Sequence, residues 1–277
     1  MPFAPSPDGL RIAYTDLGGT GAPVLFAHAT GFHGHVWRPV AGHLVDRFRC
    51  VVFDERGHGD TPPSEDGQSW HGFATDALAV VDAAGLDRPF GVGHSAGGAA
   101  LLLAELARPG TFRAIWCFEP IIPPVVGQMP PASRANPLAE GARRRREVFD
   151  SVDAAYDNYA GKPPFSALDP DALRAYVDFG FTEQPDGTVR LKCRGEVEAA
   201  TYEMAAQHGA VERLHEVRCP VVLASGGRTD TPFGPDLMAS LVERLVDGRA
   251  EPFPSLGHFG PLQDPAAIAA SIRDAFS

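Results

Sequence analysis

The sequence predicts an α/β fold, in which a mostly parallel central sheet carries helices on both faces. Short apolar runs rich in Val, Ile, Leu and Phe alternate along the chain with longer segments of helical spacing. The apolar runs lack polar alternation, which is typical of strands covered on both faces of the sheet. The 30 Gly and 26 Pro among the 277 residues also favour many tight turns over a helical bundle.

Strands and helices are expected to follow one another through most of the chain. A polar segment at Leu10–Thr15, followed by Gly18 and Gly19, is expected to form an antiparallel edge strand. The apolar runs predict further strands at Val24–His28, Cys50–Asp54, Phe90–His94, Ala114–Phe118 and Val221–Ser225, and a last strand is expected at Glu251–Ser255. Helical spacing predicts helices at Trp70–Ala84, Gly97–Ala107, Pro235–Val246 and Pro265–Phe276.

The strand–helix alternation stops between residues 123 and 217, where amphipathic helical patterns take over. Asp169 followed by Pro170 is typical of a helix start, because an N-cap acceptor precedes proline at the first helical position. Pro185-Asp186-Gly187 indicates a turn. The sequence therefore predicts one core made of residues 1–122 and 218–277, with a helical lid at 123–217 inserted after strand 6.

Charge and composition exclude several classes of function. The chain has 35 acidic and 24 basic side chains, for a formal net charge of −11. Nucleic acid and anionic membranes are therefore not expected as partners, since both need a basic face. No apolar run approaches the ~18 residues of a membrane span. The segment MPFAPSPDGL lacks the basic and apolar parts of a secretory signal, so a cytoplasmic protein is expected.

The cysteines and histidines show no metal-ligand pattern. Cys50, Cys117, Cys193 and Cys219 are scattered and form no CxxC pair, so neither zinc nor a disulfide framework is expected. Cys50 and Cys117 lie in apolar strands, where a reduced, buried thiol is expected. His28, His33 and His35 do not have metal-ligand spacing on any regular element. No metal site is predicted.

The strongest local motif is Gly93-x-Ser95-x-Gly97, which directly follows one expected strand and precedes one expected helix. Small residues on both sides let the chain turn tightly, so that the serine hydroxyl stands at the edge of the sheet. The N–H of Ala96 then lies at a helix N-terminus, where it can face a developing oxyanion. A dinucleotide-binding loop fits the same glycines less well, because at least three strands precede it.

A serine nucleophile needs a base, and His258 is the candidate. This histidine lies in Gly257-His258-Phe259, between the last expected strand and the last expected helix. The other histidines compete less well. His28 and His94 end strands and are expected to bond to the backbone, and three histidines are expected near the mouth of the site: His33, His35 and His58. Four are expected to face solvent: His43, His71, His208 and His215.

Taken together, the motifs make the chain resemble the α/β-hydrolases. Four segments occur in the order of that family: His28-Ala29-Thr30-Gly31, Asp54-Glu55-Arg56-Gly57-His58-Gly59-Asp60-Thr61, Gly93-His94-Ser95-Ala96-Gly97-Gly98 and Gly257-His258-Phe259. The resemblance covers about residues 10–120 and 218–277. It implies an α/β-hydrolase fold with Ser95 as nucleophile, His258 as general base and then acid, and an oxyanion hole formed by the N–H groups of Thr30 and Ala96. Ala29 departs from the family, which usually has glycine there.

Two carboxylates compete for the place of the acid that orients His258. The family usually has an aspartate in a G-x-x-D turn after the seventh strand, and counting from Gly227 makes that residue Asp230. Counting from Gly226 places Thr229 there instead. A second arrangement puts the acid after the sixth strand, where Glu119 lies 24 residues beyond Ser95. Glu119 is the preferred candidate and Asp230 the alternative.

A serine at this position favours attack on acyl carbonyls. The predicted function is a serine hydrolase that cleaves an ester, lactone or thioester through an acyl-enzyme, with no cofactor and with a small-molecule acyl or lactone substrate. The alternatives are a ligand-binding or receptor-like protein on the same fold, and a cofactor-free haloperoxidase or C–C hydrolase. A monomer or a homodimer is expected.

The expected lid carries seven aromatic side chains and one basic run. The aromatics are divided between lid core and pocket wall: Phe149, Tyr156, Tyr159, Phe165, Tyr176, Phe179 and Phe181. The run Arg143–Arg146 is expected to be a solvated helix face paired with Glu140 and Glu147. The alternative is that these arginines dock an anionic substrate or an acidic carrier protein.

Overall fold

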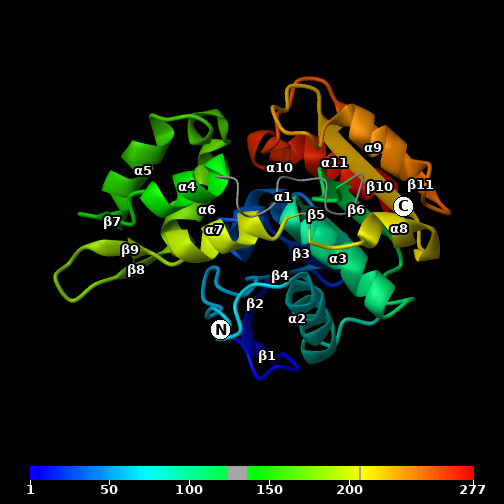
Figure 1. Cartoon of the computed structure of the whole chain (residues 1–277), viewed down its shortest axis with the longest axis horizontal. Helices are drawn as coiled ribbons and strands as arrows, with labels where there is room; N and C mark the ends of the chain where they lie inside the picture. Colours follow the sequence, from blue (N-terminus) through cyan, green and yellow to red (C-terminus); the bar gives the residue numbers. More distant parts are fainter. Residues whose placement is uncertain (124–135, 206) are drawn as a thin grey trace.

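A computed structural model describes residues 1–123, 136–205 and 207–277. An eight-stranded sheet lies at its centre, in the order β1-β2-β4-β3-β5-β6-β10-β11 (Figure 1). The strands are β1 (Phe3–Pro5), β2 (Arg11–Gly18), β3 (Ala22–Ala27), β4 (Phe48–Phe53), β5 (Phe90–His94), β6 (Ile115–Phe118), β10 (Val221–Gly226) and β11 (Gly248–Phe253). β1 and β2 pair antiparallel, and all pairs from β4 to β11 are parallel. The predicted strands and the mixed sheet are confirmed.

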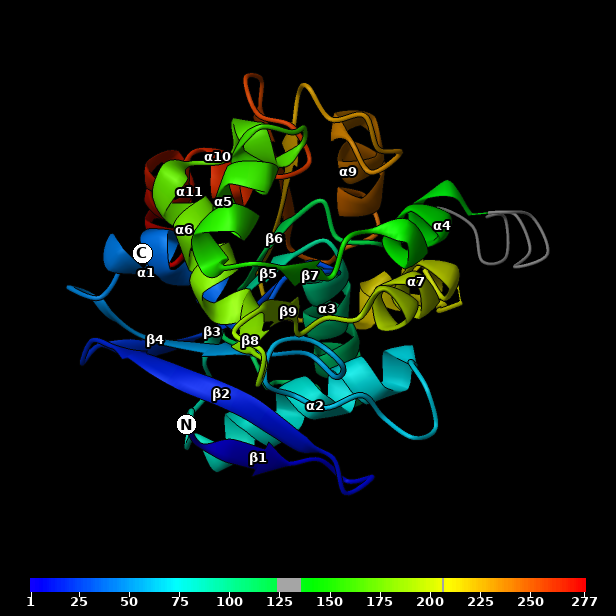
Figure 2. The ribbon, with the colours of Figure 1, turned by 90° about the vertical axis from the view of Figure 1, so that its left-hand side faces the viewer.

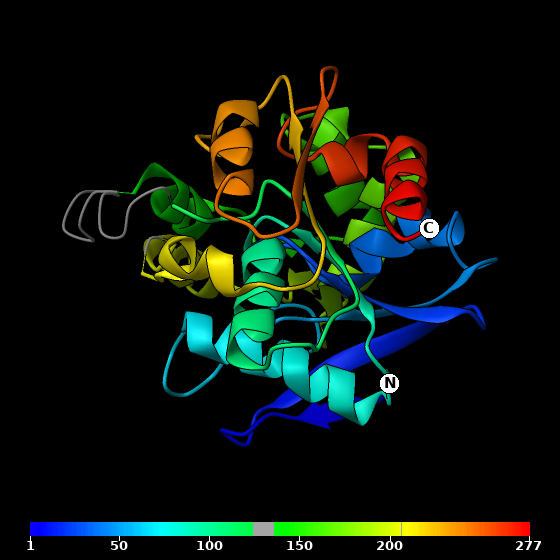
Figure 3. The ribbon, with the colours of Figure 1, turned by 90° about the vertical axis from the view of Figure 1, so that its right-hand side faces the viewer.

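Helices cover both faces of this sheet. α2 (Trp70–Ala83), α3 (Ala96–Ala107) and α9 (Pro235–Val242) follow one another on one face (Figure 3). α1 (Arg38–Gly42) and α11 (Pro265–Ala275) pack on the other. Successive strand residues enter opposite cores: Leu25 and Val51 point to the first helix layer, and Phe26 and Val52 to the second. Burial on both faces explains why the strands read as continuous apolar runs.

Residues between β6 and β10 form an insert, described here from residue 136 onward. It contains α4 (Pro137–Arg144), α5 (Val152–Ala160), α6 (Pro170–Gly180), α7 (Gly195–Glu203) and α8 (Ala210–Arg213). The predicted helix start is confirmed, because the Asp169 side chain accepts from the N–H groups of Asp171 and Ala172. The insert is not all helical, since β7 (Val148–Phe149), β9 (Val189–Leu191) and β8 (Phe181–Glu183) form a three-stranded antiparallel sheet. The predicted turn at 185–187 joins β8 to β9.

The insert packs beside the loops at one side of the central sheet. α6 contacts the 3-10 helix η1 (Gly34–Trp37), which follows β3, and the N–H of Asp169 donates to the carbonyl of Leu262 at 2.8 Å. Figure 2 views the molecule from this side and shows α5 and α6 above β2 and β4. Part of the expected lid, residues 124–135, lies outside the described residues. The insert thus lies against loops from which two of the sequence motifs come.

Candidate active site

Ser95 lies in a strained turn between β5 and α3. Its φ of 53° and ψ of −115° fall outside the regions that non-glycine residues ordinarily adopt. The neighbouring strand holds this conformation: Ser95 N–H donates to the Phe118 carbonyl at 2.9 Å, and Ile121 N–H donates to the Ser95 carbonyl at 3.1 Å. The geometry matches the sharp strand-to-helix turn predicted from the glycine spacing.

Two glycines make this turn possible through close backbone approach. A Cβ on Gly97 would lie 2.5 Å from the carbonyl carbon of Ala27, and a Cβ on Gly93 would lie 2.5 Å from Cα of Gly98. The N–H of Gly97 also donates to the carbonyl of His28 at 3.1 Å. The start of α3 therefore rests directly on the loop that follows β3.

Replacing Gly97 with alanine is expected to lower the free energy of unfolding by about 2 kcal/mol or more, because the new methyl group meets rigid backbone. Gly141→Ala is the matched control. Gly141 also lies in a helix, and a Cβ there meets nothing within 4 Å, so this change is expected to stabilise by about 0.5–1 kcal/mol. Urea unfolding measures both, and equal stability of the two variants would contradict the close approach.

His258 lies in the loop between β11 and α10 (Gly260–Gln263) and is tethered to the end of β5. The ring nitrogen Nε2 of His94 lies 2.8 Å from the carbonyl oxygen of His258, and the centroids of the two imidazole rings are 5.0 Å apart. His94 directly precedes Ser95, so this contact brings the histidine loop beside the serine turn. Nδ1 of His258 lies 2.6 Å from Oε2 of Glu119.

Glu119 follows β6, is completely buried, and has a φ of 43°. Its N–H donates to the carbonyl of Ala224 on the adjacent strand β10. Its carboxylate accepts from Gly226 N–H at 2.9 Å, from the Thr229 hydroxyl at 2.9 Å and from the Thr231 hydroxyl at 3.1 Å. Together with the contact to His258, these donors compensate a buried carboxylate that would otherwise be costly.

Asp230 does not share this position. It lies between the two threonines that bond to Glu119, but its own side chain is exposed and no hydrogen bond joins it to the other described residues. The structure therefore brings Glu119, and not the alternative Asp230, to His258. No sequence motif predicts Thr231 as part of this cluster. Its only sequence signal is the T-x-T spacing around Asp230.

The amides of Thr30 and Ala96 are both available at this edge of the sheet. Neither N–H has a hydrogen-bond partner among the residues that the structure describes. The bond from Gly97 N–H to the His28 carbonyl holds the two loops together. Ala29 is accommodated in a turn that the N–H of Phe32 closes onto the Ala29 carbonyl at 3.1 Å. Two unpaired N–H groups on adjacent loops are suited to stabilise an oxyanion.

Comparison with known proteins identifies the family of the chain. A family model described as "Alpha/beta hydrolase family" matches residues 24–271. The chain belongs to this family. It is 34% identical over 159 residues to a non-heme haloperoxidase of Rhodococcus erythropolis, covering 56% of this chain and 54% of that protein. It is 25% identical over 211 residues to 2-(acetamidomethylene)succinate hydrolase of Mesorhizobium japonicum, covering 75% and 71%.

Comparison with solved structures supports the same fold. The enol-lactonase from Burkholderia xenovorans LB400 superposes with a TM-score of 0.75 at 16% identity, over 99% of both chains. The aligned part of this α/β-hydrolase spans only about a third to a half of the first curated relatives. At these identities the relatives establish the family and the fold, and leave the substrate open.

Several histidines of this α/β-hydrolase are more buried than expected. His33, His35 and His58 do not lie at an open mouth, because all three are buried. Burial lowers the pKa of His33 and of His35 to about 4. His208 was expected to face solvent, but it is buried and its Nε2 lies 2.7 Å from the carbonyl oxygen of Ile121. The expectation for His208 is wrong because long-range packing against α2 through Trp70 covers its ring.

The two histidines at strand ends, His28 and His94, contact backbone carbonyl groups as predicted. Nδ1 of His28 lies 2.8 Å from the carbonyl oxygen of Ala29, and His94 contacts the backbone of His258. All four cysteines are free and buried, as expected for Cys50 and Cys117. Among the described residues, no group of three or more potential ligands could hold a metal ion. None of the described helices has both the length and the apolarity that a bilayer crossing requires.

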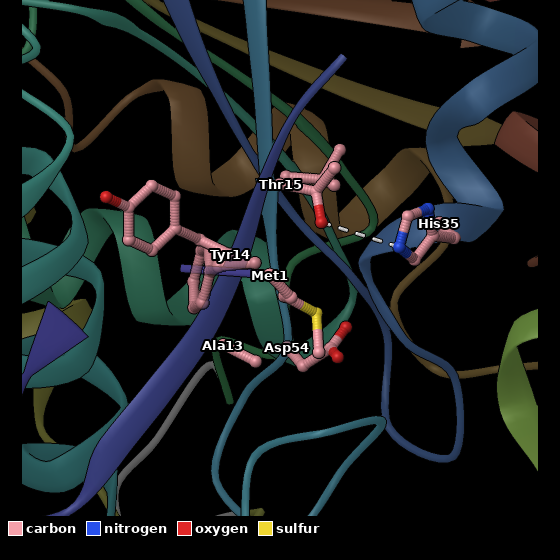
Figure 4. A pocket seen from close by; sticks show the side chains of 8 residues that line it. Met1, Ala13, Tyr14, Thr15, His35 and Asp54 are labelled. Atoms are coloured by element: carbon pink, nitrogen blue, oxygen red, sulfur yellow. Dashed lines mark hydrogen bonds between the residues drawn. The ribbon is translucent and has the colours of Figure 1, made fainter. Parts of the chain in front are cut away.

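In the part of the chain that the structure describes, two hollows border the loops that follow β3 and β4. The first, of about 300 Å³, separates the loop at 57–63 from the insert and is lined by Gly57, Gly59, Asp60, Thr61, Pro62, Pro63, Thr182, Lys192, Arg194 and Val197. The second is too narrow for a water molecule and lies beside β2 (Figure 4). There Nε2 of His35 lies 3.5 Å from the Thr15 hydroxyl. Only the first hollow has room for part of a ligand.

The basic run is not one solvated face. Arg143 and Arg144 are paired on the surface, Arg143 with Glu196 and Glu203 and Arg144 with Glu140. Glu147 pairs with Arg194 and not with the run. Arg145 is largely buried, because the chain leaves α4 at this residue in an extended conformation. The expectation of four solvated arginines is therefore wrong for Arg145.

Four of the insert aromatics are buried: Phe149, Tyr159, Tyr176 and Phe181. Phe165 is partly buried and stacks on Phe32 of the core at 5.9 Å. Tyr176 also contacts Phe32, at 5.2 Å between ring centroids. The aromatics thus serve both as the core of the insert and as its contact with the loop after β3.

Glu55 is fully buried, and neither carboxylate oxygen has a hydrogen-bond partner in the described structure. Burial, and secondarily Asp76, raises its pKa well above the ordinary glutamate value. The folded state therefore binds this proton more tightly than the unfolded state. The stability that comes from the protonated Glu55 carboxyl is fully present at pH values below the ordinary glutamate pKa. It is lost as the pH rises from that pKa through the raised pKa of the folded state.

Glu55→Met is expected to raise the free energy of unfolding at pH 8 by about 1–3 kcal/mol, because it removes an unpaired buried carboxyl. The gain is expected to be larger at pH 8 than at pH 5. Urea unfolding at both values measures it. Glu65→Met, at an exposed glutamate, is the control and is expected to change stability by less than about 0.5 kcal/mol. Destabilisation by Glu55→Met at pH 8 would contradict the argument.

Proposed function

We propose that this α/β-hydrolase is a serine hydrolase that cleaves an ester, lactone or thioester through an acyl-enzyme. The observation that carries the proposal is the strained Ser95 beside a histidine whose Nδ1 lies 2.6 Å from a buried carboxylate. Such a nucleophile, base and orienting acid form the constellation that acyl transfer needs. The hydrolase family and the enol-lactonase fold support the same chemistry.

In the proposed mechanism, the Ser95 hydroxyl attacks the substrate carbonyl while Nε2 of His258 takes its proton. Glu119 accepts from Nδ1–H, which fixes the tautomer and stabilises the imidazolium. The N–H groups of Thr30 and Ala96 donate to the oxyanion. As the intermediate collapses, His258 returns the proton to the leaving oxygen or sulfur. Water, deprotonated by His258, then attacks the acyl-enzyme. As this second intermediate collapses, the bond between the acyl carbon and the Ser95 oxygen breaks, His258 donates its proton to that oxygen, and the carboxylic acid leaves.

The insert is proposed to act as the lid that selects the substrate. Its α6 contacts η1 in the loop after β3, which carries the Thr30 amide. Tyr176 and Phe165 pack on Phe32, two residues beyond Thr30. Buried aromatic side chains at this contact favour an apolar, small acyl or lactone group near the nucleophile.

A fluorophosphonate probe followed by a substrate panel tests the proposal. We expect labelling at Ser95, and release of acid from p-nitrophenyl esters of several chain lengths or from aromatic and macrocyclic lactones. Labelling without product release from any member of the panel would favour the ligand-binding alternative. Absence of labelling in the folded protein would overturn the serine mechanism.

A second candidate, perhydrolysis, is favoured by the relative named non-heme haloperoxidase. Here hydrogen peroxide replaces water, attacks the acyl-enzyme and leaves as a peracid, and Ser95 recovers its proton through His258. The peracid would oxidise bromide to hypobromite and return as the carboxylate. Bromination of monochlorodimedone that requires acetate, peroxide and bromide together is expected if this activity is present. Bromination that persists in the Ser95→Ala variant would contradict it.

A further inference from the structure

Arg145 forms a buried polar cluster with three side chains of the insert. Nη1 donates to Oε2 of Glu198, and Nη2 donates to the hydroxyl oxygens of Tyr176 at 2.7 Å and Tyr159 at 3.1 Å. The side chains of Arg145 and Glu198 are only 15% and 9% exposed. An arginine placed this deep in a protein of net charge −11 is costly to bury and therefore requires an explanation.

This cluster borders the loop that carries the Thr30 amide. Oε1 of Glu198 lies 2.7 Å from the position that a Cβ on Gly31 would take, so the carboxylate lies directly against that loop. On the other side, the Tyr176 ring contacts Phe32 at 5.2 Å, and Phe32 contacts Phe259 at 5.5 Å. Phe259 follows His258. Through Glu198, Arg145 thus lies one side chain away from the loop that carries Thr30, and through Tyr176 and Phe32 it lies two side chains away from Phe259.

The cluster has more donors than acceptors. Among the described residues, Nε and the second hydrogen of Nη1 of Arg145 have no acceptor, and neither do the hydroxyl hydrogens of Tyr159 and Tyr176. Burial raises the pKa of Tyr176 well above its ordinary value, so its O–H remains a donor. The one carboxylate present, Glu198, accepts from Arg145 and from the Tyr202 hydroxyl. These donor positions on Arg145, Tyr159 and Tyr176 can therefore bond to a further acceptor.

We propose that Arg145, with Tyr159 and Tyr176, binds a carboxylate group carried by the substrate. A carboxylate supplies planar oxygen acceptors that match the guanidinium fork and the two phenolic O–H groups. Glu198 holds the guanidinium in place and balances its charge while the site is empty. The inference rests on the proposed function and narrows its substrates to acids that bear an ester, lactone or thioester at a second position.

Binding to the Ser95→Ala protein tests the inference without requiring turnover. The probes are monomethyl glutarate and methyl pentanoate, which differ only in a carboxylate that replaces a methyl group. Calorimetry is expected to show the half-ester binding at least about tenfold more tightly. Adding Arg145→Met together with Glu198→Gln, which removes both charges at once, is expected to abolish this preference. Arg143→Gln, on the exposed part of the run, is the matched control and is expected to retain it.

Tyr176→Phe keeps the ring and removes one O–H donor, so it provides a second test if the double variant does not fold. It is expected to reduce the preference several-fold. Equal affinity for the two probes in the Ser95→Ala protein, or an unchanged preference in the folded double variant or in Tyr176→Phe, would overturn the inference. Hydrolysis of neutral esters would still support the proposed function in that case. Conversely, a carboxylate preference without hydrolysis would support the site and contradict the function.

Discussion

Ser95→Ala is expected to lower kcat for the best p-nitrophenyl ester by about five to six orders of magnitude. The hydroxyl belongs to the one side chain in the proposed mechanism that forms a bond to the acyl carbon. Residual catalysis would come from the amides of Thr30 and Ala96 and from substrate binding alone. Alanine adopts the strained backbone of this position no worse than serine does, so the fold is expected to persist.

Steady-state kinetics of the purified variant and the parent measure this loss of kcat. Thermal unfolding checks that the variant is folded. Ser255→Ala is the matched control, because Ser255 is an exposed serine only three residues before His258. It is expected to retain activity within about twofold of the parent, as surface substitutions usually do. More than a tenth of the parental kcat in folded Ser95→Ala would exclude an acyl-enzyme on this residue.

Glu119→Gln is expected to lower kcat by about three to four orders of magnitude while KM changes little. Glutamine can place an N–H donor opposite Nδ1 of His258, and this favours the tautomer whose Nε2 cannot take the serine proton. The amide still fits the buried site, where Gly226 N–H and two threonine hydroxyls face the parental carboxylate. The loss is therefore expected in kcat, since it affects the chemical step.

The Asp230→Asn variant is the comparison that decides which carboxylate orients His258. Asp230 is exposed, and it is not hydrogen-bonded to the other described residues, so its replacement is expected to change kcat less than about threefold. Kinetics on one substrate at one pH suffice for both variants. Comparable losses from Glu119→Gln and Asp230→Asn, or a larger loss from the second, would contradict the assignment of Glu119.

The sequence predicts the central sheet well, because each of its buried strands is a continuous apolar run. It also predicts Ser95 and His258, since local glycine spacing and position between a strand and a helix identify both. It leaves the acid open. Glu119 and Asp230 follow neighbouring parallel strands at the same edge, and only the register of β6 against β10 and the turn after β10 decide which reaches the histidine. This register and this turn depend on tertiary structure, which the local sequence does not reveal.

The insert is where sequence reasoning does least well. Its strands β7, β8 and β9 have two or three residues each, too few to show a period, and β7 pairs with residues some forty positions away. The burial of Arg145 is equally nonlocal. Within Arg143–Arg146 the four side chains are identical, and their fates differ only because the chain leaves α4 there in an extended conformation.

The candidate site divides the chain into two kinds of segment. Ser95, Glu119, His258 and the two amides all belong to loops of the central sheet, whereas Arg145, Tyr159, Tyr176 and Glu198 belong to the contiguous insert. Under the two proposals above, the chemistry and the recognition of the substrate belong to separate segments of the chain. Exchange of this one block of sequence could change the substrate without disturbing the strained turns at Ser95 and Glu119. The same boundary gives an engineer a place to graft another insert onto an unchanged reaction centre.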